Sequence, residues 1–408
     1  PLPFLWAVHA RSTARLSHSM TVQIITSEHQ LSELRPAWNR LAAGQPFRSW
    51  DWQVAWWRHY GRLQDRQLHI LACFDGEELL GLLPCYRRLT ALGRVLRPLA
   101  SGEVCSEYLG LLSKRGHDLQ IAGEFADSLS GRGRNPRGQG TTQGWELLLL
   151  DAQDPHDATL HALIQELTRR GHPIDTHSGA ACWRISFDED TQHPWGSEAY
   201  AKHRFESYLK QVARNHRHRL RKAERHGLEE GFTFHLASDQ ASLDRGFAIL
   251  VELHQRRRAL HGQVGMFARR RFLSFHQDAT QSLLDAGKLW VAWLQKGNTP
   301  IAAYYCLADQ GALYCYQSGL DPDHLDDEPG RILLLILLRR ALRLGFSSLD
   351  LLRGNEPYKS HLGAKPQASL NVFVGNRDLL GRAAFSLTQF KRRSRRLAGQ
   401  VLRHVRPP

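Results

Sequence analysis

Apolar residues along this chain form short runs typical of strands and longer runs with helical spacing. Residues 68–85 and 289–306 share one pattern, which is an apolar strand, a polar turn that contains glycine and a second apolar strand. This pattern is typical of β-hairpins. Each hairpin follows a segment with the spacing of a helix, 49–61 and 270–287. The repeated order of helix, hairpin and strand predicts a duplicated α/β unit.

The second unit continues as a βαβ pattern. A third apolar strand (312–320) leads through a polar loop into a long apolar helix (331–345), and the strand 347–352 follows. We therefore expect an α/β (α+β) protein of two tandem units, with mixed sheets flanked by helices. The expected segments are a disordered leader or misplaced start before Met20 (1–19), a first unit (20–190), a second unit (191–375) and a basic C-terminal tail (376–408).

A basic helix is predicted between the two units, from Glu206 to Gly227, where the glycine is expected to end it. One face is apolar, formed by Phe205, Leu209, Val212, Leu220 and Ala223. Another face carries Arg214, Arg217, Arg221 and Arg225. This second face is either a solvated polar surface or a basic track for an anionic ligand.

The net charge of +14 is concentrated in two segments. Residues 202–226 hold nine Lys/Arg against two acids, and residues 391–408 hold seven Lys/Arg and no acid. Each segment therefore carries +7, and the rest of the chain is neutral. The C-terminal segment is either a solvated terminus or, through the short apolar stripe of Leu397, Val401 and Leu402, a peripheral contact for anionic lipid or nucleic acid.

Several classes of protein are disfavoured by the composition. No apolar run approaches the ~18 residues of a transmembrane helix. The six cysteines are scattered without a C-x-x-C pair, which is typical of buried thiols in a reducing compartment such as the cytoplasm. The histidines show no H-E-x-x-H spacing, so we expect no metal site.

A cluster of reactive side chains directly follows the strand 347–352. The stretch "RGNEPYK" places Arg353, Glu356, Tyr358 and Lys359 within seven residues, and Asp350 lies inside the strand. Ligands of α/β sheets bind beyond the carboxyl ends of strands, so this cluster is a candidate site. In the alternative interpretation Asp350 only caps the backbone, and Arg353 and Glu356 form a surface pair of little energetic weight.

The segment 329–359 resembles the closing half of the GNAT-like acetyltransferase domain found in the cellulose-biosynthesis protein CelD and its relatives. The resemblance rests on Pro329-Gly330, Gly345, Asp350, Arg353-Gly354 and Tyr358-Lys359. The basic stretch 214–228 is similar to a helix of the Fem-type peptidoglycan-bridge transferases, and 105–112 resembles an S-D-Y element of the same families. Together these similarities cover roughly residues 47–365.

This resemblance implies an N-acyltransferase that uses acetyl-CoA or another acyl-CoA and no metal. The acceptor it implies is an amine, on a sugar or a cell-envelope or exopolysaccharide precursor. The implied catalytic residues are Glu356, Tyr358 and Asp350, with Glu356 or Asp350 as base and Tyr358 as acid. The implied cofactor-binding residues are Gly330, Arg331, Gln317 and Ser318. The implied substrate-binding residues are Arg353, Lys359, Tyr108, Arg217 and Arg221.

One departure from the family keeps two alternatives open. Of the usual pyrophosphate loop only Gly330 and the helix start remain, and three acids stand in the loop: Asp326, Asp327 and Glu328. The first alternative is a Fem-like transferase that draws on aminoacyl-tRNA, with the arginine track binding phosphates. The second is a non-catalytic GNAT scaffold that binds a partner or nucleic acid.

Overall fold

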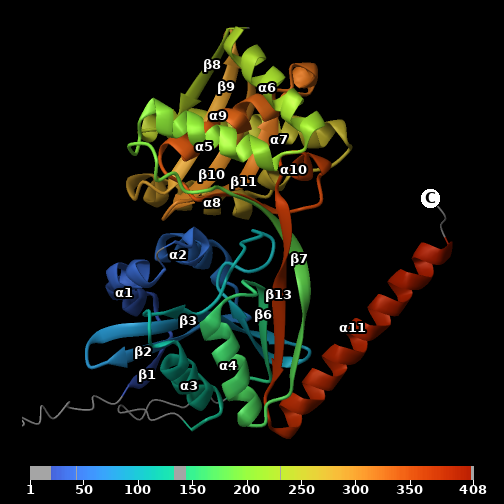
Figure 1. Ribbon diagram of the computed structural model, residues 1–408. Helices are drawn as coiled ribbons and strands as arrows, with labels where there is room; N and C mark the ends of the chain where they lie inside the picture. Colours follow the sequence, from blue (N-terminus) through green and yellow to red (C-terminus); the bar gives the residue numbers. More distant parts are fainter. Residues whose placement is uncertain (1–19, 43, 133–143, 230, 406–408) are drawn as a thin grey trace, which may run out of the picture.

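The chain folds into two halves with the same order of elements (Figure 1). The computed structural model describes residues 20–42, 44–132, 144–229 and 231–405. For residues 226–229 and 395–405 this description covers the backbone only. The first half contains, in chain order, β1 (Thr21–Ile25), α1 (Glu28–Leu41), a 3₁₀ turn (Pro46–Arg48), α2 (Trp50–Trp56), a π-helical turn (Trp57–Gly61), β2 (Arg66–Asp75), β3 (Glu78–Thr90), β4 (Gly93–Pro98), β5 (Leu112–Ser113), α3 (Asp118–Leu129), β6 (Leu147–Gln153), α4 (Ala158–Arg169) and β7 (Ile174–Ser186).

The second half begins with two connecting helices and ends with a long helix. Its elements are α5 (Glu198–Gln211), α6 (Arg214–Glu229), β8 (Phe232–Leu236), α7 (Gln240–Leu260), a 3₁₀ turn (Met266–Ala268), α8 (Arg270–Asp285), β9 (Leu289–Lys296), β10 (Thr299–Asp309), β11 (Ala312–Leu320), a 3₁₀ turn (Pro322–Asp327), α9 (Pro329–Arg343), β12 (Ser348–Arg353), α10 (Pro357–His361), β13 (Lys365–Gly375) and α11 (Leu379–Val405).

The expected duplication is confirmed by this order. Each half runs strand, two helices, three-stranded meander, helix, strand, helix and strand, from β1 to β7 and from β8 to β13. In each half the third strand of the meander pairs in parallel with the strand that follows the next helix, β4 with β6 and β11 with β12. All other described pairings are antiparallel.

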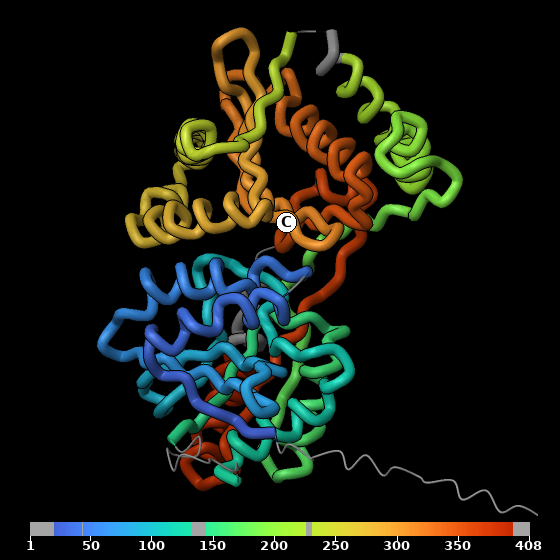
Figure 2. The backbone as a smooth tube through the Cα atoms, turned by 90° about the vertical axis from the view of Figure 1, so that its left-hand side faces the viewer, coloured from blue at the N-terminus to red at the C-terminus, as the bar shows by residue number. Residues whose placement is uncertain are grey.

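The two halves share one sheet because they exchange their last strands. The order through the sheet is β1-β2-β3-β4-β6-β13-β7-β12-β11-β10-β9-β8, with β5 beside β3. The last strand of the second half, β13, therefore pairs with β6 of the first half, and β7 of the first half pairs with β12 of the second. Figure 1 shows β7 and β13 running side by side from one half into the other, and Figure 2 shows the halves stacked along this ribbon. The division of the chain near residue 190 remains a proposal, because neither half completes its sheet alone.

Apolar side chains form three large cores around this sheet. One lies in the first half beneath α3 and α4, and one lies in the second half beneath α5, α6 and α9. The largest joins the halves, since it contains Trp52 and Trp56 of α2 together with Phe272 and Phe275 of α8. The rings of Trp52 and Phe275 meet edge to face at 4.9 Å.

The predicted helix from Glu206 to Gly227 is wrong in two respects. The chain breaks after α5, because Val212 adopts an extended conformation (φ −86°, ψ 139°), and a new helix starts at Arg214. The Arg217 guanidinium donates to the Val212 carbonyl oxygen at 3.1 Å, which satisfies an acceptor at this break. Helix α6 then runs through Gly227 to Glu229, since glycine inside a helix costs only about 1 kcal/mol. The five predicted apolar residues are all buried.

Three further expectations concern the ends and the glycine-rich loop. The leader 1–19 and most of the loop 131–144 lie outside the described residues. The segment expected to be a basic tail forms the helix α11 (Leu379–Val405). Within the described residues no helix combines the length and apolar character needed to cross a membrane.

The strand exchange predicts that the halves do not fold independently. A fragment of residues 20–190 would expose the edges of β6 and β7 that β13 covers in the full chain. We expect this fragment to be aggregated or largely unfolded by circular dichroism and size-exclusion chromatography, and to become soluble when residues 191–408 are co-expressed. A monomeric, cooperatively folded 20–190 fragment would contradict the expectation.

Candidate active site

The site begins where β11 and β12 stop pairing. Their parallel register covers only Ala312–Tyr314 against Ser348–Asp350, although β11 continues to Leu320 and β12 to Arg353. On its other side β11 carries a bulge against β10, between the pairs Tyr305–Gln317 and Cys306–Cys315. A bulge bends its strand. Beyond Tyr314 no described strand pairs with the β12-facing edge of β11, so this edge is open to a ligand.

A cavity of about 410 Å³ occupies the space between the two strand ends. It is called cavity 1 below. Its lining comes from the ends of β11 and β12, from helix α7 and from the start of α10. The residues are Cys105, His254, Arg257, Arg258, His261, Tyr304, Cys315, Tyr316, Gln317, Ser318, Leu351, Leu352, Arg353, Glu356, Tyr358 and Lys359.

A second cavity of about 260 Å³, cavity 2, lies at the start of α9. Its lining includes Gly330 and Arg331 of α9 and residues of α6, β11 and α10. Four residues line both cavities and form the boundary between them: Arg257, Tyr304, Ser318 and Tyr358. The two cavities therefore adjoin, with Tyr358 between them.

The start of α9 offers one unpaired backbone donor to cavity 2, the Gly330 N–H, because Pro329 has none and the N–H groups of Arg331 and Ile332 donate to the Glu328 carbonyl oxygen. The helix begins at Pro329, and Glu328 at its N-cap makes no side-chain hydrogen bond to the first turn. Free N–H groups and the positive end of the helix dipole attract anions. A Cβ atom on Gly330 would lie 2.8 Å from the end of the Leu320 side chain, which would have to move to make room for it.

The ionisable side chains that line cavity 2 beside its leucines are mostly basic. These are His216, Arg219, Arg257, Arg331 and His361, against the single acid Glu328. The Glu328 carboxylate pairs with Arg331, and the Asp327 carboxylate pairs with the Lys296 ammonium at 3.0 Å. Neither Arg219 nor Arg257 forms an ion pair with a described residue. The acids of this loop are thus largely compensated, and two arginine charges remain for an anion.

Tyr358 stands in the first turn of α10 with its hydroxyl group unused. The residue is 38% exposed, and its hydroxyl makes no hydrogen bond to any described residue. Burial of the phenol raises its pKa, with the neighbouring Cys315 and Glu356 adding to the effect. The hydroxyl is therefore protonated at neutral pH and can donate a proton at the boundary between the cavities.

Glu356 and Lys359 also line cavity 1, but they differ in what they can do. Partial burial raises the pKa of Glu356, and this is outweighed by a backbone hydrogen bond and by Lys359, so the pKa lies below its usual range. Lys359 is buried, and its ammonium donates to the carbonyl oxygens of Leu352 (3.1 Å) and Arg353 (2.7 Å). Lys359 therefore holds the turn after β12 rather than facing the cavity as a free cation.

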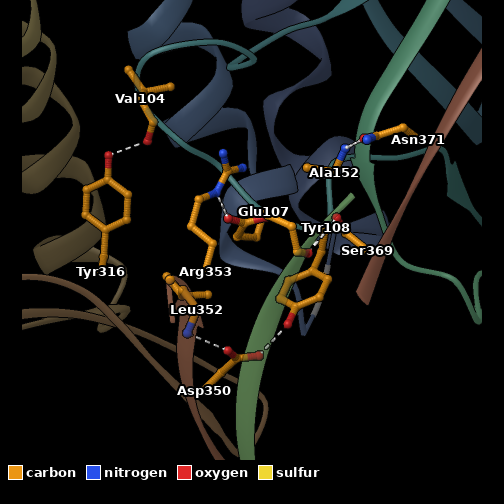
Figure 3. Close-up of polar contacts among 12 residues, drawn as sticks. Val104, Glu107, Tyr108, Ala152, Tyr316, Asp350, Leu352, Arg353, Ser369 and Asn371 are labelled. Atoms are coloured by element: carbon orange, nitrogen blue, oxygen red, sulfur yellow. Dashed lines mark hydrogen bonds and ion pairs between the residues drawn. The ribbon is translucent and has the colours of Figure 1, made fainter. Parts of the chain in front are cut away.

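Asp350 lies outside both cavities and is completely buried. Its carboxylate accepts hydrogen bonds from the Tyr108 hydroxyl (2.6 Å) and the Leu352 N–H (2.8 Å), which Figure 3 shows, and from the Arg184 guanidinium (3.1 Å). These bonds occupy both oxygens of Asp350. Tyr108 is likewise only 3% exposed and lines neither cavity 1 nor cavity 2.

Arg353 lines cavity 1 while pairing with a buried acid of the first half. Figure 3 shows its guanidinium against the Glu107 carboxylate, which is fully buried. Tyr316, also in the wall of cavity 1, donates its hydroxyl proton to the Val104 carbonyl oxygen at 2.5 Å. The loop around residue 105 of the first half thereby fixes one wall of the cavity.

The structure brings together most, but not all, of the residues expected from sequence. Cavity 1 or cavity 2 is lined by Glu356, Tyr358, Arg353, Lys359, Gln317, Ser318, Gly330 and Arg331. Asp350, Tyr108, Arg217 and Arg221 line neither. Arg221 pairs with the Glu206 carboxylate at 2.8 Å on the surface, so the predicted arginine track turns away from both cavities, while His216 and Arg219 of the same helix reach cavity 2.

Helix α7 contributes residues that the sequence interpretation missed. His254, Arg257, Arg258 and His261 line cavity 1. Their spacing of i, i+3, i+4 and i+7 places them on one helix face, and this spacing was the available signal. Burial lowers the pKa of His254 to about 4, helped by Arg258 and Arg257, so its imidazole is neutral at pH 7.

One group among the described residues has the composition of a metal site. Asp190, His193 and His203 present one carboxylate oxygen and two ring nitrogens within 4.8 Å of one another. The Asp190 oxygen lies 2.9 Å from the His193 Nδ1 atom and 3.0 Å from the His203 Nδ1 atom. None of the three lines cavity 1 or cavity 2.

Comparisons with known proteins agree with this geometry. Residues 214–360 match the family described as "Acetyltransferase (GNAT) domain", a segment that contains most of the lining of both cavities. No curated protein sequence matches the chain. Among solved structures, FemX is similar with a TM-score of 0.57 and 11% identity, over 86% of this chain and 96% of that one. At this identity the similarity concerns the fold, which is that of FemX over nearly its whole length.

Two further solved structures are similar at lower scores. One is the C-terminal domain of a putative lysylphosphatidylglycerol synthetase from Agrobacterium fabrum, with a TM-score of 0.48 and 11% identity over 88% of this chain and 95% of that one. The other is a tandem GNAT protein from the clavulanic acid biosynthesis pathway, with a TM-score of 0.42 and 12% identity over 88% and 99%.

The environment of Lys359 predicts a structural effect of its substitution. Lys359→Ala would leave several carbonyl oxygens and the Glu356 carboxylate without their donor. We expect the free energy of unfolding to fall by about 2–4 kcal/mol in urea titrations. The exposed Lys365→Ala serves as a control and is expected to stay within about 0.5 kcal/mol of the parent. Unchanged stability with weakened substrate binding would instead support the anion-binding role expected from sequence.

Proposed function

We propose that the chain is an N-acyltransferase that moves an acyl group from acyl-CoA to an amine. The observation that carries the proposal is the position of Tyr358, whose free hydroxyl stands between a basic cavity and the open end of the β11–β12 cleft. The GNAT match over residues 214–360 supports the same reaction class. The CelD-like resemblance supports a sugar or an envelope or exopolysaccharide precursor as the acceptor.

In this proposal cavity 2 holds the phosphates of the donor. Coenzyme A is a polyanion, and the start of α9 with Arg219, Arg257 and Arg331 offers the free Gly330 N–H, the positive end of the helix dipole and cationic side chains. The acyl thioester would then reach past Ser318 toward Tyr358. Free N–H groups on the unpaired edge of β11 near Gln317 would bind the thioester carbonyl oxygen as negative charge develops on it.

The reaction requires two proton transfers on opposite sides of the thioester. The amine nitrogen attacks the carbonyl carbon, the carbon–sulfur bond breaks, and the leaving thiolate takes the proton of the Tyr358 hydroxyl. The surplus proton of the amine passes to a base on the cavity 1 side. Glu356 is our assignment for that base, since its carboxylate is ionised and 56% exposed in the cavity, and neutral His254 is the second acceptor there. The buried Asp350 is assigned a positioning role.

A Fem-like transfer from aminoacyl-tRNA is the second candidate. The observations that favour it are the FemX fold and the net charge of +7 on residues 202–226. The acyl chemistry would be the same, and the difference would lie in the carrier. The cytoplasm is the compartment that fits either carrier.

The donor can be tested by comparing the two carriers directly. We expect acetyl-CoA and coenzyme A to raise the melting temperature of the full chain, and free thiol to appear when acetyl-CoA is mixed with an amine panel. Binding of tRNA that weakens steeply with salt, without any response to coenzyme A, would favour the Fem-like candidate. A chain that binds neither carrier would point to a non-catalytic scaffold.

Loss of the Tyr358 hydroxyl is expected to slow turnover while leaving the fold intact. Tyr358→Phe removes no hydrogen bond between described residues, so its melting temperature should match the parent. Thiol release should fall by on the order of 10²–10⁴-fold. Tyr208→Phe is the matched control, because Tyr208 lines neither cavity and its buried hydroxyl donates to the Leu362 carbonyl oxygen at 3.0 Å. That variant should lose about 1 kcal/mol of stability and keep its turnover per folded molecule.

The arginines of cavity 2 are expected to affect donor binding more than chemistry. Arg219→Gln and Arg257→Gln each remove a cation that forms no ion pair with a described residue. We expect the Kd for coenzyme A, measured by calorimetry, to rise about 10- to 100-fold, with a smaller change in kcat. The control is Arg62→Gln, which should leave the Kd unchanged. Arg62 forms an exposed ion pair with Glu28 in the first half and does not line cavity 2. Equal Kd values for all variants would remove cavity 2 from donor binding.

A further inference from the structure

Helix α11 presents an apolar face that no described residue covers. Leu380, Leu387 and Phe390 are 69%, 52% and 70% exposed, and Leu379 at the helix start is 87% exposed. With the exposed Ala383, these side chains recur at spacings of three and four residues and therefore share one side of the helix. Large apolar side chains that gather on one exposed face mark an interaction surface.

The opposite face of α11 is fixed to the body of the protein. Ala384 and Phe385 pack against Val95 and Leu147 of the first half. Further along, Gln389 and Arg392 both donate to the Asp175 carboxylate, at 2.9 and 3.0 Å. These contacts set the rotation of the helix, so its apolar face points away from the sheet. In Figure 1 the rest of the helix extends away from the body.

The charge around this face selects the kind of partner. Residues 379–408 contain Arg382 and the seven Lys/Arg of 391–408, and no acid. In the described part Lys391 and Arg393 are exposed beside the apolar face. In the sequence, Leu397 and Val401 continue the same spacing, although their side chains lie outside the described residues. An apolar stripe bordered by cations is the pattern of helices that lie in the surface of an anionic membrane.

We propose that α11 docks this protein on an anionic lipid bilayer, lying parallel to the surface with Leu380, Leu387 and Phe390 among the acyl chains. Lys391 and Arg393 then lie at the level of the lipid phosphates. A nucleic acid would use the cations but leave the apolar side chains exposed to water. A second copy of the chain would bring two strongly basic segments together, which charge repulsion opposes. The proposal is independent of the reaction assigned to the two cavities.

Vesicle flotation of the full chain tests the proposal. We expect co-flotation with phosphatidylcholine vesicles that contain roughly a quarter phosphatidylglycerol, and little with pure phosphatidylcholine. The double variant Leu387→Ser/Phe390→Ser should weaken the partition by on the order of tenfold or more, because it removes buried apolar surface. Lys391→Gln/Arg393→Gln should weaken binding only to the anionic vesicles and flatten its salt dependence.

The matched control is Leu89→Ser/Leu119→Ser, which changes two leucines of similar exposure (66% and 74%) elsewhere on the surface. It should float like the parent, and all variants should keep the parent's melting temperature. Three outcomes would overturn the proposal. In the first, the full chain does not float with anionic vesicles. In the second, the control and Leu387→Ser/Phe390→Ser lose flotation to the same extent. In the third, light scattering detects a dimer that only Leu387→Ser/Phe390→Ser dissociates. Tight binding to a DNA duplex that is unaffected by Leu387→Ser/Phe390→Ser, without flotation, would assign the helix to nucleic acid instead.

Discussion

The buried ion pair between Asp350 and Arg184 lies where the exchanged strands meet the cleft, and the site depends on it. Asp350 belongs to β12 of the second half and Arg184 to β7 of the first, and Tyr108 adds a hydrogen bond from a first-half loop. A buried charge that loses its partner costs several kcal/mol. Separation of the two halves would therefore either expose the Asp350 carboxylate to water or leave it buried without Arg184. The same seam contains the pair of Arg353 with the fully buried Glu107, so a wall of cavity 1 is anchored in the other half.

This seam also shapes the backbone that carries Tyr358. Leu352 adopts a left-handed conformation (φ 54°), which a non-glycine residue takes only when its surroundings compensate the strain. Here its N–H donates to the Asp350 carboxylate, and its carbonyl oxygen accepts from the Lys359 ammonium. Because Lys359 belongs to α10, the strand end and the helix that presents Tyr358 are fastened together. Ala152, at the equivalent place on β6, has the same φ of 54° and donates to the Asn371 side chain.

The sequence was most informative where local pattern decides the structure. The range 312–320 is the same as that of β11, and the apolar helix begins only two residues before its predicted start, because apolar periodicity and glycine punctuation act over a few residues. The exchange of β7 and β13 could not be predicted, since each strand has the pattern of the last strand of its own unit and only tertiary pairing distinguishes the two arrangements.

The role of α7 was missed for a related reason. His254 and Arg257 are far in sequence from "RGNEPYK", and their contact with it arises from the packing of α7 on β11.

The two halves differ at the position where the proposed anionic donor would bind. In the second half a short connection of eight residues, 321–328, leads from β11 into α9, which leaves the cleft open and the helix start uncapped. In the first half the corresponding connection, 99–117, is longer, and Val104, Tyr108 and other residues of it are buried against the second half. The start of α3 then faces a cavity of about 280 Å³ whose acids are Asp118, Asp154 and Asp157. Negative charge there repels a polyphosphate, whereas the same position in the second half is basic. The longer connection of the first half thus supports the second half, since its residues Val104, Cys105 and Glu107 contact or form the wall of cavity 1.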